Sequence, residues 1–139
     1  MAANVRFEEM RDYVNACPYY RHLGFRVETV DEGYARLLMP VGEQLYQFHG
    51  AVHGGAIYSL ADAAVAVALL TLAGPGEQVV TIEGKLNFLA PVREGELLAE
   101  GRIVQRGRRI ALGESDVSLD GLDGLVAKGL FTYTLWRPR

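Results

Sequence analysis

The chain has 139 residues, half of them hydrophobic, which is enough to bury the core of one globular domain over residues 1–139. Its formal net charge of -3 excludes the basic surface that nucleic-acid-binding proteins carry. The single cysteine, Cys17, cannot form an internal disulfide, and the N-terminus lacks the apolar core of a signal peptide. No apolar run approaches the roughly 20 residues that span a bilayer. We therefore expect a cytoplasmic protein without a membrane or nucleic-acid partner.

Two helices are expected. Apolar residues recur at helical spacing from a possible cap at Asn4 up to Pro18, so residues 1–20 should form a helical segment that packs over an edge of the core. A longer helix is expected over residues 53–73, where alanine, valine and leucine lie on every side. A helix that is apolar all round is buried all round, so this helix should lie at the centre of the fold.

The remaining segments predict strands. Two short runs on either side of Asp31-Glu32-Gly33 indicate an antiparallel hairpin, with glycine where a positive φ is needed. Four longer runs after the central helix predict a four-strand meander: "QVVTIEGKLNFLAPV", "GELLAEGRIVQR", "RRIALGESDVSL" and "LVAKGLFTYTLWRP". In the first run one parity is apolar, which predicts one covered face; its members are Val80, Ile82, Leu86 and Phe88.

These elements predict an α+β fold, an antiparallel sheet of about five to six strands wrapped around one long helix. Such a sheet leaves part of the helix facing away from it, and a chain of 139 residues has nothing else to cover that part. A partner subunit is the simplest cover, so we expect a homodimer, which can pair further into a dimer of dimers.

One carboxylate, Asp62, lies in the middle of the central helix, in a stretch that is otherwise uncharged from Glu43 to Glu77. Its helical neighbours cannot neutralise it, and a buried, unpaired carboxylate is costly or has its pKa raised. Two interpretations stay open. Asp62 either forms an ion pair with a distant arginine, or faces a cleft as nucleophile or general base.

The central helix should begin at Gly54 or Gly55, where free backbone N–H groups and the positive end of the helix dipole can stabilise an oxyanion. The same glycines also permit tight packing of helix on sheet. Asp62 lies eight residues beyond Gly54, about 12 Å along an α-helix, so one helix cannot bring both to the same carbonyl. Two helices packed antiparallel across a two-fold axis can, and the dimer would then hold two equivalent sites.

Other chemistries lack their motifs. His49 and His53 have no third ligand at a recognisable spacing, so we expect no metal site and no cofactor. On its own, His53 is more simply a hydrogen-bonding residue at the start of the helix. No Gly-x-Ser-x-Gly elbow is present, so serine-hydrolase chemistry has no support.

The stretch "HGGAIYSLADAAVAVA", preceded by "QFHGAV" and followed by β-rich segments, resembles the PaaI-like acyl-CoA thioesterases of the phenylacetate pathway, which have the hotdog fold. The resemblance runs from about Gly24 to Trp136 and depends on His-Gly-Gly followed by Leu-Ala-Asp at the family's spacing. It implies hydrolysis of an acyl-CoA thioester to a carboxylic acid and free CoA.

The resemblance also implies a role for each site residue. The N–H of Gly54, with His53 beside it, would polarise the thioester carbonyl, and Asp62 of the partner chain would attack it or activate water. Gln47 occupies a position where the family commonly has asparagine, and its amide can still donate a hydrogen bond. Thr81 is the nearest match to a hydroxyl that positions the water.

The ends of the substrate are less defined. Tyr46, Phe48 and Tyr58 could line an aryl-accepting pocket or belong to the core, so aryl-acetyl, benzoyl and medium-chain acyl groups stay open. Similar proteins hold the phosphates of coenzyme A near the surface, and a guanidinium pairs well with phosphate, although a charged turn is usually just solvated. The candidates for that role are Arg106, Arg108 and Arg109, with Lys85 and Arg93 as competitors.

Two functions from other classes remain. A non-catalytic module that binds or senses acyl-CoA would show saturable binding without thiol release, and the presence of Asp62 argues against it. A hotdog hydratase or dehydratase would need a catalytic histidine with a separate acid on a different pattern, which Leu60-Ala61-Asp62 does not supply. Thioester hydrolysis is favoured over both.

Overall fold

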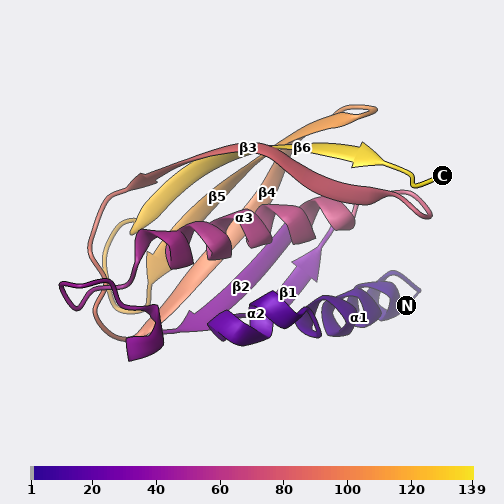
Figure 1. Ribbon diagram of the computed structural model, residues 1–139. Coiled ribbons are helices and arrows are strands. Elements are labelled where there is room, and N and C mark those ends of the chain that lie inside the picture. The colour runs from indigo at the N-terminus through magenta and orange to yellow at the C-terminus, as the bar shows by residue number, and fades with distance from the viewer. Residues whose placement is uncertain (1) are drawn as a thin grey trace.

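The computed structural model describes the backbone of residues 2–139 and the side chains of residues 6–139. One six-stranded antiparallel sheet curves around one long helix (Figure 1). The elements in chain order are α1 (Ala2–Asn15), α2 (Pro18–Leu23), β1 (Arg26–Asp31), β2 (Tyr34–Pro40), the 3-10 turn η1 (Glu43–Leu45), α3 (Gly54–Leu70), β3 (Gln78–Phe88), β4 (Glu96–Arg106), β5 (Ile110–Leu119) and β6 (Ala127–Trp136). This is the α+β hotdog arrangement that the sequence predicted.

The order of the strands differs from the expected four-strand meander. The sheet runs β1-β2-β4-β5-β6-β3, so β3 pairs with β6 and is not a neighbour of β4. Only β4, β5 and β6 form a meander. The chain leaves β2, follows α3, and enters the sheet again at the opposite edge, as Figure 1 shows. Strand pairing is decided by where this crossing ends, and a local pattern of residues does not contain that information.

The expected apolar face of β3 is also wrong in part. The register against β6 shifts just after Thr81, which marks a β-bulge, and an inserted residue exchanges the two faces of a strand. As a result Val80 and Ile82 are 48% and 55% exposed, whereas Leu86, beyond the bulge, packs against the core. Thr81 lies opposite the buried Tyr133 and faces α3. The bulge therefore turns a polar side chain toward the helix.

Helix α3 begins at Gly54, as expected, and is buried on most sides within one chain. Its buried members are Ala56, Ile57, Leu60, Ala61, Ala63, Ala64, Val65, Val67, Ala68 and Leu69. A row of half-buried residues runs along the remaining side at four-residue spacing: Tyr58, Asp62, Ala66 and Leu70. The incompletely covered side of the central helix therefore contains Asp62.

The N-terminal segment contains two helices where the sequence predicted one. Helix α1 packs against β1, and the side chain of Asn15 exchanges two hydrogen bonds with the backbone of Val27, at 2.7 and 3.2 Å. Pro18 ends the first helix but also starts α2, because proline is well suited to the first turn of a helix. The Tyr19 hydroxyl lies 2.7 Å from Ser59 Oγ, so α2 rests on the first turns of α3.

The hairpin between β1 and β2 is confirmed, with antiparallel pairing and Gly33 at a φ of 67°. In residues 2–139, no helix combines the length and the apolarity that a membrane crossing requires.

Candidate active site

The carboxylate of Asp62 is held by two hydroxyl groups. Thr81 Oγ1 donates to Asp62 Oδ1 at 3.0 Å and lies 3.3 Å from Oδ2. The Tyr133 hydroxyl also donates to the carboxylate, and it lies 2.7 Å from the backbone oxygen of the same aspartate. Within residues 6–139 no lysine, arginine or histidine lies within 4 Å of this carboxylate. The alternative of an ion pair with a distant arginine is therefore wrong.

The sheet brings these groups together. Thr81 on β3 and Tyr133 on β6 are direct partners in the antiparallel ladder, so their side chains lie on the same face, toward α3. Burial raises the pKa of the Tyr133 phenol strongly, and the charge of Asp62 raises it further. Tyr133 thus stays protonated and acts as a donor. Burial is also the main reason that the pKa of the nearby Tyr20 is raised, with smaller contributions from Cys17 and Asp62.

Tyr133 is a site residue that the sequence did not predict. It lies in "FTYTLW", where alternate residues point to one face, and it is only 1% exposed. The alternation identifies it as an inward-facing residue. Its neighbour across the sheet follows only from the β3–β6 register, which the expected meander had placed elsewhere.

The start of α3 holds one free backbone donor. His53 precedes the helix in an extended conformation, with φ -61° and ψ 136°, and its Nδ1 accepts a hydrogen bond from the N–H of Gly55 at 2.8 Å. Gly55 is therefore occupied by the histidine, which performs the hydrogen-bonding role expected of it. The Gly54 N–H has no hydrogen-bond partner within the described chain. Gly54, and not Gly55, is thus the donor available to an oxyanion.

A hollow of about 380 Å³ opens beside this donor, lined by Gln47, Ala51, Val52, Gly54, Ile57, Phe88, Leu89, Ala90, Pro91 and Val92. The side-chain oxygen of Gln47 accepts a hydrogen bond from the backbone N–H of His49, which leaves its NH₂ group free to donate. Gly54 is tightly packed, because a Cβ atom there would lie 3.2 Å from the ring of Phe88.

The three predicted aromatic residues lie outside this hollow. The Tyr46 hydroxyl donates to the backbone oxygen of Arg93, and Tyr58 packs edge-on against Phe131 with the ring centroids 5.4 Å apart. Burial, followed by the charges of Asp62 and Glu83, raises the pKa of Tyr58. The side chain of Phe48 is fully exposed.

Asp62 lies at the midpoint of α3, eight residues from Gly54 and eight from Leu70. The two halves of the predicted site are therefore about 12 Å apart along the axis of one continuous helix. Neither Asp62 nor Thr81 lines the hollow beside Gly54. The structure of one chain thus brings Thr81 to Asp62 and Gln47 to Gly54, and keeps the two pairs apart.

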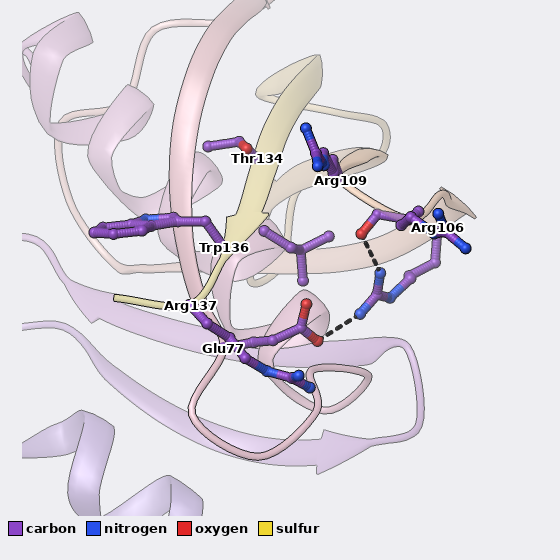
Figure 2. Close-up of a pocket in the computed structure, with 8 residues that line it drawn as sticks. Glu77, Arg106, Arg109, Thr134, Trp136 and Arg137 are labelled. Carbon is purple, nitrogen blue, oxygen red and sulfur yellow. Dashed lines mark hydrogen bonds and ion pairs between the residues drawn. The ribbon is translucent and has the colours of Figure 1, made fainter. Parts of the chain in front are cut away.

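The predicted arginines gather elsewhere. Arg106, Arg108 and Arg109 line a hollow of about 770 Å³ at the other end of α3, where the β4–β5 turn meets the end of β6 (Figure 2). The competitors Lys85 and Arg93 do not line it. Among residues 2–139, no three side chains of the His, Cys, Asp and Glu types are grouped so that they could hold a metal ion.

Comparison with known proteins shows similarity over the fold and over most of the site. A family model described as the thioesterase superfamily matches residues 49–121, just over half of the chain. A protein of Saccharolobus solfataricus named "Putative esterase" is 33% identical over 130 residues, covering 93% of this chain and 85% of that protein. The matched family segment contains Gly54, Asp62 and Thr81, whereas Tyr133 lies beyond it.

Two solved structures share the arrangement of helix and sheet. A thioesterase family protein from Silicibacter pomeroyi has a TM-score of 0.86 and 28% identity, over 94% of this chain and 98% of that one. A mutant of the phenylacetic acid degradation protein PaaI from Thermus thermophilus has a TM-score of 0.77 and 30% identity, over 87% of this chain and 99% of that one. The similarity therefore extends over nearly the whole length of each structure.

Proposed function

Since this chain belongs to the thioesterase superfamily, we propose that it hydrolyses the thioester of an acyl-CoA to a carboxylic acid and free CoA, with Asp62 at the reacting carbonyl. One observation carries the proposal. The carboxylate of Asp62 is half-buried without a cation, and its partners Thr81 and Tyr133 orient it without neutralising it. A carboxylate kept in that state is suited to act as a base or nucleophile.

Two courses of reaction fit this arrangement. As a general base, Asp62 takes a proton from a water molecule whose oxygen attacks the carbonyl carbon. The tetrahedral intermediate then collapses, the C–S bond breaks, and the CoA thiolate leaves and takes up the proton. As a nucleophile, the carboxylate attacks the carbon itself, the thiolate leaves, and water hydrolyses the resulting anhydride. In the first course the Thr81 hydroxyl can orient the water.

The N–H of Gly54 stabilises the oxyanion in either course. It lies at the positive end of the α3 dipole and has no partner within the described chain. The NH₂ group of Gln47 lies beside the same hollow and can add a second donor. The hollow also has apolar walls, including Ile57 and Phe88, which suit an aryl or medium-chain acyl group.

A complete site requires two chains. The half-buried row on α3 contains Asp62, and β3, which carries Thr81, forms an edge of the sheet with no partner on its outer side within the described residues. A second copy packed antiparallel against this face would cover the row and set its Gly54 beside Asp62. We therefore propose a homodimer, which can associate into a tetramer, with each site shared between the chains.

A thiol-release assay with aryl and aliphatic acyl-CoAs tests the reaction. We expect release from at least one member of the panel, and its loss in Asp62→Asn. Saturable binding of every acyl-CoA without release from any would contradict the proposed hydrolysis and favour a binding module. Hydration or dehydration of the acyl chain without release would favour the hydratase class.

Mixed dimers test the sharing of the site. Asp62→Asn and Gly54→Pro are each expected to be nearly inactive as homodimers. A heterodimer of the two holds one site with both native residues if the site is shared, and none if it lies within one chain. Activity recovered on mixing unfolded chains and refolding them together supports the shared site, and its absence from purified heterodimers rejects it.

A further inference from the structure

The hollow at the far end of α3 is rich in positive charge. Its walls contain four arginines and one glutamate among the residues Glu77, Arg106, Arg108, Arg109, Thr134, Leu135, Trp136 and Arg137. In Figure 1 the β4–β5 turn, the end of β6 and the turn before β3 all lie at this end of the molecule. A local excess of three positive charges stands out in a chain whose formal net charge is -3.

Arg106 and Glu77 form the frame of this hollow. Arg106 Nη2 lies 2.7 Å from Glu77 Oε1, and its Nη1 donates to the backbone oxygens of Gly107 and Arg108 at 2.6 and 3.1 Å. Glu77 also accepts a hydrogen bond from the N–H of Gly74, which is the largest of the causes that lower the pKa of its carboxyl. The donors of Arg106 are thus largely used in holding the β4–β5 turn against the turn before β3.

The other three arginines are free. Arg108, Arg109 and Arg137 are exposed, and none has a carboxylate within 4 Å in residues 6–139. Figure 2 shows Arg137 on the side of Glu77 opposite Arg106, and the indole of Trp136 directed away from these side chains. Three guanidinium groups around one hollow repel one another unless an anion lies between them. Their planar forks match the oxygens of a phosphate.

The position of the hollow fits one end of the proposed substrate. Its β6 residues directly follow Tyr133, a partner of Asp62, and a strand rises about 3.3 Å per residue, so Arg137 lies about 13 Å along the chain from Tyr133. The end of α3 is likewise about 12 Å beyond Asp62. In coenzyme A an extended pantetheine arm separates the thioester from the nucleotide phosphates, and such an arm can span these distances.

We propose that this hollow binds the phosphates of an adenine nucleotide, with Arg108, Arg109 and Arg137 as the ligands and Arg106 as the residue that positions the turn. The inference extends the proposed function, because the nucleotide is either the CoA end of the substrate or a free nucleotide. It narrows the candidates for phosphate binding, since Arg106 becomes a positioning residue and Arg137 joins the set.

Direct binding tests the site without any turnover. Adenosine 3′,5′-bisphosphate should bind the wild-type protein in isothermal titration calorimetry, more weakly as salt is added. The variant with Arg108, Arg109 and Arg137 all changed to alanine should lose at least about tenfold in affinity. Lys85→Ala and Arg93→Ala are the matched controls and should bind as the wild type does. Absence of binding, or equal affinity in the triple variant, overturns the proposal.

Kinetics then distinguish the two sources of the nucleotide. If the site takes the CoA end, the triple variant raises KM for an acyl-CoA with little change in kcat, and leaves hydrolysis of the matching acyl-pantetheine unchanged. Adenosine 3′,5′-bisphosphate then competes with acyl-CoA. If the site takes a free nucleotide, the bisphosphate alters acyl-pantetheine hydrolysis in the wild type and not in the triple variant. Absence of thiol release from every thioester would contradict the proposed function but leave the binding result intact.

Discussion

The start and the centre of α3 hold the two halves of the proposed site, and they are built in different ways. At the start, the free N–H of Gly54 depends on His53, the residue directly before it. At the centre, Asp62 is oriented by Thr81 and Tyr133, which lie 19 and 71 residues away along the chain. The first half is local, and the second is assembled by the sheet. Substitutions in the two halves should therefore have different effects on rate and on stability.

The largest expected effect is on the rate, at the centre of the helix. Asp62→Asn keeps the shape of the side chain and removes the base or nucleophile, so kcat for thiol release should fall by about 10³-fold. Circular dichroism and light scattering should show the native fold and the same oligomer. Wild-type turnover in a correctly folded variant would show that Asp62 is not the reacting group.

At the start of the helix, a pair of variants separates the N–H group from the space around it. Gly54→Pro removes the donor, and both the first helical position and the extended conformation of His53 suit a proline. Gly54→Ala keeps the donor and adds the same Cβ atom near Phe88. We expect kcat/KM of the proline variant to be lower than that of the alanine variant by about 10²-fold. Equal rates would mean that this N–H does not contact the oxyanion.

The sheet-built half should also lose stability when a donor is removed. Tyr133→Phe deletes a buried hydrogen bond to a charged group, and we expect the free energy of unfolding in urea to fall by about 1.5–3 kcal/mol. Thr81→Val removes the other hydroxyl at a less buried position and should cost less. If Tyr133→Phe were as stable as the wild type, its bond to Asp62 would not contribute to the fold.

The smallest expected effect is a loss of stability at alkaline pH. The pKa of Tyr133 is raised by burial in the folded chain, above its unfolded value of about 10. Its contribution to stability is therefore fully present below about pH 10 and is lost as the pH rises towards the folded value. The stability advantage of the wild type over Tyr133→Phe should then shrink between about pH 9 and pH 11. An unchanged difference would contradict the raised pKa.

Features with local causes were predictable. Gly33 in its turn, the start of α3 at Gly54 and the unpaired acid at position 62 all follow from chain-local chemistry, and the structure confirms each placement. The free N–H at Gly54 rather than Gly55 was not distinguishable, because it depends on which way the His53 ring turns. Helix α2 was missed for a related reason, since Pro18 is both a stop for one helix and a start for the next.

Features that depend on pairing were not predictable. The pairing of β3 with β6 and the bulge after Thr81 decide which side chains meet Asp62, and neither is contained in the alternation of residues within one strand. The apolar parity of β3 predicted the covered face at Leu86 and failed at Val80, because the bulge lies between them. Tyr133 was identifiable only as buried.

By itself, the sequence determined the elements, the central helix and the isolation of Asp62 within it, because helix caps, turn glycines and hydrophobic periodicity act over a few residues. The tertiary structure decided what surrounds that carboxylate: two hydroxyls and no cation, with the free N–H about 12 Å away on the same helix. These contacts join residues far apart in the chain, and their free energy depends on the register of the sheet, which only the folded chain defines.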